Sequence, residues 1–527
     1  MSIRSQSPTG SVTEKKDVVK HLERTTVTEF VVPDADYDTN ASAGFWGRFL
    51  KKSPSPRFLE DLQRMNETEL DEVKIQKIER KLDWLIIPAL AICYAFYYID
   101  KTTLAYAAIF GIKTDLHLRK TEYSWLSSLF YFGWLFWALP GNLLMQKFPL
   151  NKYLAIFIWG GLLMAQAASR NFTELAILRT LSGAAEAIAD PAFMLISSTW
   201  WTRAQQPRVI GLWYCANGGG IGLGGLLGYA IGSIKGGLAS WKYEFLIIGA
   251  LCCLWSIVLF IFIPDSPYTT HWFTREERLI IVSRKRHDQH VADARKWDKG
   301  QILEAFMDIK IYLFFFFGLT ANIPNGGTSN FGTLIVKGFG FDTLTTTLMQ
   351  IPYGAVIVLF ILVTIFVNNR LPLGNRTWLM VATNIPTVAG FAMVAWGKNT
   401  ATRLAGFWMT GASNATFVVG LSLVSGNVGG TTKKAIASAA VFLGVAAGQV
   451  EAPVYLTGVI ACMVSRAAEI VVIILLRVVF VTSNNRRDKA LASGQIEYDP
   501  RHIPLDDVSD WKNPAFRYVT LGAPKDV

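Results

Sequence analysis

Charged residues are scarce in this chain. Only 17% of its 527 residues are Asp, Glu, Lys or Arg, whereas 51% are hydrophobic, and the mean hydropathy is +0.30. A soluble protein of this length would carry more charge and divide into several domains. The charges also gather in residues 1–83, near 265–310 and after 483, with long apolar segments between them. This distribution excludes an ordinary soluble globular protein.

Cysteine is scarce too, and none of the five cysteines belongs to a CxxC pair. We therefore expect buried, reduced thiols, with no disulfide framework and no metal site. The first 80 residues are polar, so no cleavable signal peptide is expected. Outside the apolar segments the sequence has no metal-ligand cluster, nucleophile elbow or phosphate-binding loop. We therefore expect no enzyme and no cofactor.

The net charge of +11 arises from Lys and Arg that lie beside apolar segments. Nucleic-acid binding would need a soluble basic face, which this distribution does not provide. Positive charge next to apolar segments indicates membrane topology instead. Among the partners we therefore predict a lipid bilayer and no nucleic acid, and we predict a monomer.

The apolar segments are long enough to cross a bilayer, which takes about 20 residues per helix. Twelve candidates follow one another at 84–108, 121–145, 152–169, 173–198, 207–232, 242–264, 309–335, 343–367, 377–397, 403–427, 433–453 and 455–479. Six segments, a charged connection and six more segments are typical of two-bundle carriers. The sequence thus predicts an all-α membrane protein with 12 transmembrane helices in two six-helix bundles.

Five parts are expected along the chain. They are a largely disordered cytosolic tail at 1–83, a first bundle at 84–264, a cytosolic central loop at 265–308, a second bundle at 309–479 and a cytosolic tail at 480–527. The predicted inner loops carry more Lys and Arg than the outer loops. This asymmetry favours both termini in the cytosol.

Ionisable residues inside the spans are few, and they are functional candidates because charge is costly in a bilayer. They include Asp100, Lys101, Arg179, Glu186, Asp190, Lys310, Glu451, Arg466 and Glu469. We expect Lys310 and Glu451 to lie near span ends and reach the interface. Arg466 and Glu469 are three residues apart, so they share a helix face and can pair.

Asp100, Lys101 and Arg179 are predicted to form one cluster. At 1.5 Å per residue, Asp100 lies roughly 12 Å and Arg179 roughly 9 Å below the outer surface. The cluster is either a structural ion pair or a site where Lys101 or Arg179 binds a substrate carboxylate. Glu186 lies deeper, where a carboxyl can exchange protons near neutral pH, unless it is permanently protonated or paired. Asp100 and Glu186 are thus the proton-coupling candidates.

Glycine and asparagine mark two other spans. Residues 217–225 form the sequence NGGGIGLGG, and because no strand precedes it, it indicates close helix packing rather than a nucleotide-binding loop. The segment from Asn322 to Thr328 contains Pro and paired Gly, which predicts either a broken helix beside a cavity or a simple kink. Asn217, Asn322, Asn325 and Tyr98 join Lys101 and Arg179 as candidates for substrate binding.

Residues 98–116, YIDKTTLAYAAIFGIKTDL, and 178–187, LRTLSGAAEA, resemble segments of the fungal allantoate permease family. These proteins are anion:cation symporters of the major facilitator superfamily, and the resemblance covers about residues 75–490. It implies the major facilitator fold and proton-coupled uptake of a small organic anion across the plasma membrane by alternating access. The expected substrate is an allantoate-, nicotinate- or pantothenate-like monocarboxylate, and the proton gradient is the energy source.

The resemblance places Asp100, Lys101, Arg179 and Glu186 on recurrent charged positions of that family. Asp190 departs from the family pattern, which has a small or hydroxyl residue before the proline. Two other functions fit the same spans. One is export of a secondary metabolite, and the other is a nutrient sensor that does not transport.

Overall fold

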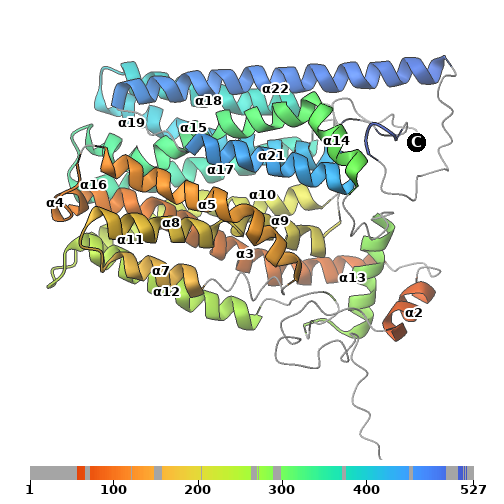
Figure 1. Cartoon of the computed structure of the whole chain (residues 1–527), viewed down its shortest axis with the longest axis horizontal. Coiled ribbons are helices and arrows are strands. Elements are labelled where there is room, and N and C mark those ends of the chain that lie inside the picture. The colour runs from red at the N-terminus through yellow and green to blue at the C-terminus, as the bar shows by residue number, and fades with distance from the viewer. Residues whose placement is uncertain are drawn as a thin grey trace, which may run out of the picture.

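The computed structural model describes residues 56–65, 72–119, 121–147, 157–202, 205–262, 267, 270, 272–288, 298–370, 375–449, 455–493, 509–513, 516 and 518. These residues form helices, most of which lie side by side along one direction, and they contain no β-strand (Figure 1). The predicted disordered segment before residue 56 and Glu451 lie outside the described residues.

Every predicted span coincides with one helix or with consecutive helices. In the first half these are α3 (Glu72–Ile109), α5 (Glu122–Lys147), α7 (Phe157–Gln166), α8 (Phe172–Glu186) with α9 (Ala189–Trp200), α10 (Gln206–Tyr214) with α11 (Ala216–Gly232), and α12 (Ser240–Phe262). In the second half they are α15 (Ile309–Lys337), α16 (Thr343–Leu348) with α17 (Gln350–Arg370), α18 (Arg376–Trp396), α19 (Thr400–Met409) with η4 (Thr410–Ala412) and α20 (Ser413–Asn427), α21 (Thr431–Gln449), and α22 (Tyr455–Ala492).

Six helical stretches of the described chain are long and apolar enough to cross a bilayer on their own. They are Glu72–Ile109, Ser240–Phe262, Thr343–Asn368, Arg376–Trp396, Thr400–Val424 and Gly458–Ala492. The other predicted spans are shorter, interrupted or more polar. In α15, for example, Asn322 and Asn325 lower the hydropathy at the middle of the helix. Polar residues at this depth are tolerated where they face protein or a cavity rather than lipid.

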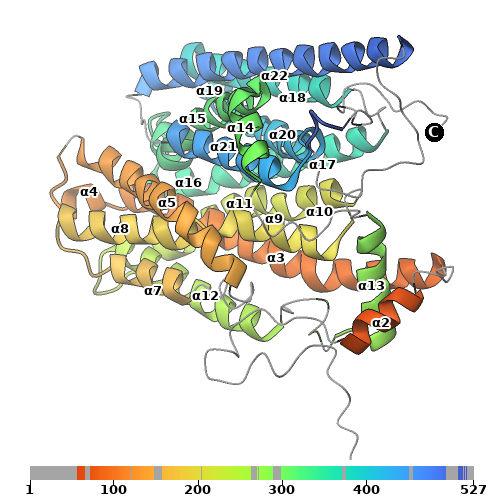
Figure 2. The ribbon, with the colours of Figure 1, turned by 45° about the vertical axis from the view of Figure 1, so that its right-hand side comes forward.

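The helices assemble into two bundles that lie against each other (Figures 1 and 2). In the first bundle α5 packs on α8, and α7 packs on α12. In the second bundle α15 packs on α21 and α22, and α18 packs on α19 and α22. The bundles meet mainly through α11 with α17 and α3 with α15. The cavity candidates on α3, α11 and α15 therefore belong to the helices that form the bundle interface.

Part of the predicted central loop is helical and is tied to the first bundle. It contains α13 (Arg275–Asp288) and α14 (Lys299–Met307), and α13 packs on α2 (Pro56–Met65). Arg275 pairs with Asp61 of α2 at 2.8 Å. Lys81 of α3 pairs with Glu277 at 3.0 Å. α3 therefore begins before the predicted span start at 84. Charged residues of this additional part, such as Lys81, pair with residues of α13 outside the membrane.

Glycine allows α11 and α17 to touch. A Cβ atom on Gly218 would lie 2.4 Å from the backbone oxygen of Gly354, and one on Gly354 would lie 2.2 Å from the oxygen of Gly218. By contrast, a Cβ atom on Gly219 would have no atom within 4 Å. The prediction that the glycine run serves close helix packing is confirmed.

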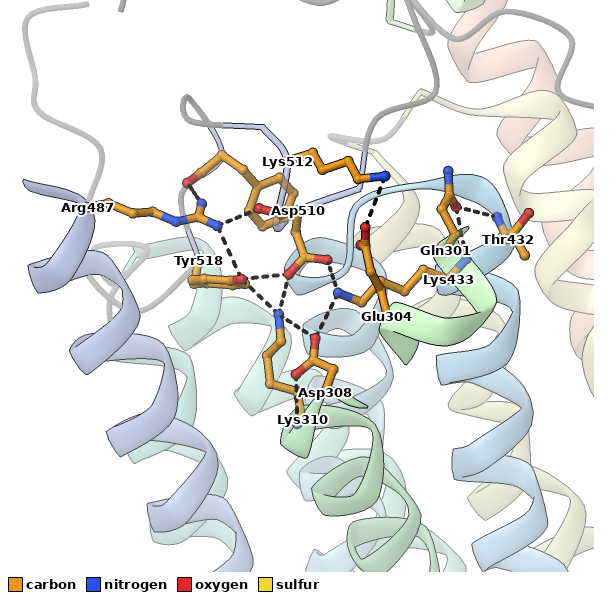
Figure 3. Close-up of polar contacts among 11 residues, drawn as sticks. Gln301, Glu304, Asp308, Lys310, Thr432, Lys433, Arg487, Asp510, Lys512 and Tyr518 are labelled. Carbon is orange, nitrogen blue, oxygen red and sulfur yellow. Dashed lines mark hydrogen bonds and ion pairs between the residues drawn. The ribbon is translucent and has the colours of Figure 1, made fainter. Parts of the chain in front are cut away.

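The C-terminal segment, residues 509–513, 516 and 518, docks against the second bundle. Its Asp510 is fully buried and pairs with Lys310 of α15 and, at 2.9 Å, with Lys433 of α21 (Figure 3). Asp308 pairs with Lys310 at 3.3 Å and with Lys433 at 2.8 Å. Two buried ammonium groups are therefore balanced by two carboxylates, one of which comes from the C-terminal segment.

Aromatic and backbone contacts hold this segment in place. The Tyr518 ring stacks on Phe480 of α22 with a centroid distance of 5.6 Å, and the Tyr518 hydroxyl donates to Asp510 at 2.6 Å. Arg487 of α22 donates to the backbone oxygens of Asp510 and Phe516. α22 therefore continues beyond the predicted span end at 479, because the polar residues of its final turns contact the C-terminal segment.

Lys310 lies at the start of α15, near the span end where we expected it, but the expectation that its amine reaches the interface is wrong. The amine is buried beside Asp510 and Asp308. Burial raises the pKa of the Asp510 carboxyl, but Lys310, the Tyr518 hydroxyl and Lys433 outweigh burial and hold this pKa below its usual range. A carboxyl with a lowered pKa adds stability at neutral pH that is lost only when the pH falls through that pKa. The ionised Asp510 carboxylate therefore keeps this contribution to stability across the physiological pH range.

The contact at Gly218 predicts different effects for two neighbouring substitutions. Gly218→Ala should lower the thermal stability of the purified protein in detergent by about 2 kcal/mol, since its methyl group collides with backbone that cannot move aside. Gly219→Ala is the matched control and should change stability by less than about 0.5 kcal/mol. Equal melting temperatures for the two variants would contradict the close approach of α11 and α17.

The charge balance at Asp510 predicts a second result. Asp510→Asn leaves two buried lysines with one carboxylate and should destabilise the protein by about 3 kcal/mol. Adding Lys433→Met to that variant removes the excess charge and should restore most of the loss. Lys512→Gln removes the exposed partner of the mostly buried Glu304 and should cost less than about 1 kcal/mol. Thermal unfolding of all three variants checks this, and Asp510→Asn behaving like Lys512→Gln would refute the balance.

Candidate functional site

Lys101 projects from α3 into a cage of tyrosine rings. Its Nζ atom lies 5.5 Å from the ring centre of Tyr98, 5.6 Å from that of Tyr131 and 5.8 Å from that of Tyr97. Ammonium groups are attracted to aromatic faces at such distances. The rings therefore stabilise a buried cation without neutralising its charge, which leaves Lys101 able to attract an anion.

A hollow of about 420 Å³, here named the lysine hollow, lies next to this cage between the two bundles. Lys101, Tyr98 and Asp190 line it from the first bundle, and Asn322 and Asn325 line it from the second. Four residues that the sequence predicted for the site thus line one cavity, together with Asp190, which departs from the family pattern. Of the residues that line it, Lys101 and Asp190 are the charged ones.

Two further hollows extend the site and share Asn325 with the lysine hollow. One, of about 350 Å³, is lined by Asn322, Asn325 and Arg466, and we name it the arginine hollow. The other, of about 360 Å³, is lined by Asn217, Asn325 and Asn414. The side-chain amide of Asn217 donates to Asn414 of α20 at 2.8 Å across the bundle interface. Asn325 therefore shares its hollows with several other side-chain amides, which can both donate and accept hydrogen bonds.

The asparagines on α15 are held by their own helix. Asn322 donates to the backbone oxygen of Gly318 at 3.1 Å, and Asn325 donates to the Asn322 side chain at 3.1 Å. α15 is continuous through Pro324, so of the two predicted alternatives the broken helix is wrong, although the segment does line a cavity. The Ser465 hydroxyl of α22 donates at 2.9 Å to the backbone oxygen of Thr320, which Pro324 leaves without its usual helical partner, and this contact helps the helix to continue.

Asp100 and Arg179 form a buried ion pair away from the hollows. Arg179 Nη1 lies 4.0 Å from Asp100 Oδ1, and the Trp159 indole donates to Asp100 Oδ2 at 2.6 Å. The Arg179 guanidinium also lies 4.9 Å from the ring centre of Phe130. Neither Asp100 nor Arg179 lines any of the three hollows. The geometry favours the structural ion pair over direct contact of Arg179 with a substrate.

Glu186 is fully buried at the end of α8 and also lies outside the three hollows. Among the residues that the structure describes, no donor reaches either of its carboxyl oxygens. Asp100 is the charged group that interacts with it most strongly, followed by Lys101 and Arg179. A carboxyl in such a place tolerates a proton better than a charge. Its surroundings suit a proton carrier next to the ion pair.

The cavity residues that were absent from the predicted site include Asp190, Asn414 and Arg466. Arg466 pairs with Glu469 at 2.7 Å, as their spacing predicted, and Asn384 of α18 donates to the same Glu469 oxygen at 2.9 Å. The sequence carried a signal for Asp190 and Arg466, since each is an ionisable residue inside a span. Asn414 has no such signal, because a neutral amide in a polar stretch is common.

Comparison with known proteins agrees with this architecture. The sequence profile of the Major Facilitator Superfamily matches residues 90–453. An uncharacterized transporter of Schizosaccharomyces pombe is 33% identical over 84% of this chain and 86% of its own length. Allantoate permease of Saccharomyces cerevisiae is 31% identical over 87% of this chain and 89% of its own length.

Solved structures show the same fold at low identity. The crystal structure of a D-xylose–proton symporter has a TM-score of 0.55 and 10% identity, and it covers 75% of this chain and 97% of its own. A partially occluded inward-open structure of the xylose transporter XylE from E. coli has a TM-score of 0.54 and 12% identity, with 76% and 97% coverage. At these identities the likeness concerns the fold alone.

The structural role of the Asp100–Arg179 pair predicts a rescue. Arg179→Gln leaves a buried carboxylate without its cation and should destabilise the protein by about 3 kcal/mol. Adding Asp100→Asn removes that charge and should restore a monodisperse protein, as judged by size-exclusion chromatography and thermal unfolding. A double variant no more stable than Arg179→Gln alone would contradict the pairing.

Proposed function

Because the chain belongs to the major facilitator superfamily and, within it, to the allantoate permease family, we propose that it couples uptake of a small organic anion to protons. The family makes it a multi-pass membrane protein and a secondary transporter, not an enzyme. The observation that carries the finer proposal is Lys101, a cation that lines the cavity between the bundles.

The substrate class follows from what lines the cavity. Lys101 offers a positive charge to a carboxylate from the first bundle, and Asn322 and Asn325 offer amide groups from the second. A monocarboxylate with a polar body, similar to allantoate, nicotinate or pantothenate, would contact both walls at once. The name of the 31% identical relative, allantoate permease, supports this class.

Proton coupling is assigned to the buried acids of the first bundle. Glu186 has no donor among the described residues and lies close to the Asp100–Arg179 pair. A change in its protonation alters the charge of this cluster, which is coupled to Lys101. The proton gradient then supplies the energy for uptake, and no cofactor is needed.

Alternating access requires contacts that close one side of the cavity. At the end of the bundles opposite α13 and α14, the Tyr123 hydroxyl donates to the backbone oxygen of Asn330 at 2.9 Å. Thr333 donates to the oxygen of Ala105 at 3.0 Å. These bonds join the first bundle to α15, and we assign them to the closed outer side. Opening outward would break them as one bundle rocks against the other.

Location and assembly complete the proposal. The excess of Lys and Arg on one side of the spans supports cytosolic termini. A plasma-membrane location and a monomer fit an uptake carrier whose cavity is built within one chain.

Uptake measurements test this function. Cells that lack their own carboxylate permeases and express this chain should accumulate radiolabelled allantoate, nicotinate or pantothenate, and a protonophore should abolish accumulation. Lys101→Met should reduce uptake at least tenfold, because the anion loses its cation. Glu186→Gln should weaken the pH dependence of uptake, because the amide cannot carry a proton.

Glu244→Gln provides the matched control. Glu244 is also fully buried in the first bundle without a donor among the described residues, but it lines none of the three hollows. This variant should keep protonophore-sensitive uptake. Uptake of none of the three anions, or uptake unaffected by the protonophore, would overturn the proposed function. Unchanged pH dependence in Glu186→Gln would remove Glu186 from the role.

A further inference from the structure

Asp190 has no task in the function proposed so far, yet it lines the lysine hollow together with Lys101. It follows the interruption between α8 and α9, in the first turn of α9. The Tyr97 hydroxyl donates to its Oδ2 atom at 3.4 Å. Asp190 is half-buried, whereas Asp100 and Glu186 are fully buried outside the hollow. It is therefore the acid that a ligand in this cavity would meet.

The groups around Asp190 make Lys101 its principal counter-charge. Tyr94, Tyr97, Tyr98 and Lys101 face it from α3, Tyr214 faces it from α10, and Glu186 interacts with it from α8. The tyrosines are neutral, and within the described part of the chain Glu186 has no donor that would stabilise its charge. Lys101 is thus the cation available to balance an ionised Asp190.

From this geometry we infer that Asp190 and the substrate carboxylate compete for Lys101, so that Asp190 must take up a proton before the anion binds. The inference rests on the proposed function and deepens it, because it places one coupled proton in the substrate cavity itself.

Charge counting gives the reason. With Asp190 ionised, the Lys101–Asp190 pair is neutral, and a bound anion would leave one uncompensated negative charge in a low-dielectric cavity. With Asp190 protonated, Lys101 and the anion form the neutral pair. One proton therefore enters with each anion and leaves with it, so the ion and the substrate are linked at a single site. Glu186, outside the hollow, can respond to the same event without touching the substrate.

Neutral variants of Asp190 test this link. In Asp190→Asn, Lys101 has lost its competitor, so the anion should bind without a proton. Counterflow exchange of the radiolabelled anion, whichever of allantoate, nicotinate or pantothenate the wild type takes up, should persist. Protonophore-sensitive accumulation should be lost. The apparent affinity, which in the wild type should fall up to tenfold per pH unit once Asp190 ionises, should become independent of pH.

Two further variants of Asp190 serve as controls in this test. Asp190→Glu preserves the acid and should retain accumulation, and Asp190→Ser is a second neutral variant should the asparagine variant not fold. Accumulation with wild-type pH dependence in either neutral variant would overturn the inference while leaving the proposed function intact. Loss of both exchange and accumulation in a folded neutral variant would also overturn it. Uptake by the wild type that ignores a protonophore would instead refute the proposed function.

Discussion

A charge inside a bilayer needs a compensating group, and this requirement shapes both bundles. In the first bundle Asp100 of α3 pairs with Arg179 of α8, and the Trp159 indole donates to Asp100. In the second bundle Arg466 and Glu469 lie one turn apart on α22, and Asn384 of α18 joins them. The contacts of Asp100 with Arg179 and of Asn384 with Glu469 join separate helices, so rotating one of these helices would take a buried charged group away from one of its partners.

Lys101 differs from these ion-paired groups, and its positive charge allows the cavity to attract an anion. Tyrosine rings solvate its charge without neutralising it, and Asp190 shares its hollow. The aromatic rings offset only part of the free-energy cost of removing the Lys101 ammonium group from water. An anion that enters from solution therefore still stabilises this group. Close glycine contacts such as Gly218 with Gly354 keep the two bundles near enough for one small ligand to touch both.

The sequence predicted where the helices lie along the chain better than it predicted which side chains of different helices meet. Length and hydropathy located all twelve spans, and depth counting along two helices paired Asp100 with Arg179. The proximity of Asp190 to Lys101 depends on how α9 rotates after the interruption at Ala187, which no local pattern encodes. Asn414 lies on α20, whose apolar residues show no preferred face. The partner of Lys310 is 200 residues away in the chain, beyond the reach of any periodicity.

That long separation has a consequence for how the protein is made. Lys310 and Lys433 enter the second bundle while the chain is still growing, but Asp510 leaves the ribosome about 10 to 40 s after Lys310 at ordinary rates of translation. Until then the bundle holds two ammonium groups against the single carboxylate of Asp308. The cluster of Lys310 and Lys433 thus gains its second carboxylate only after all the helices of the second bundle have been made. A chain that ended before Asp510 would keep one buried ammonium group in excess of the carboxylates that balance it.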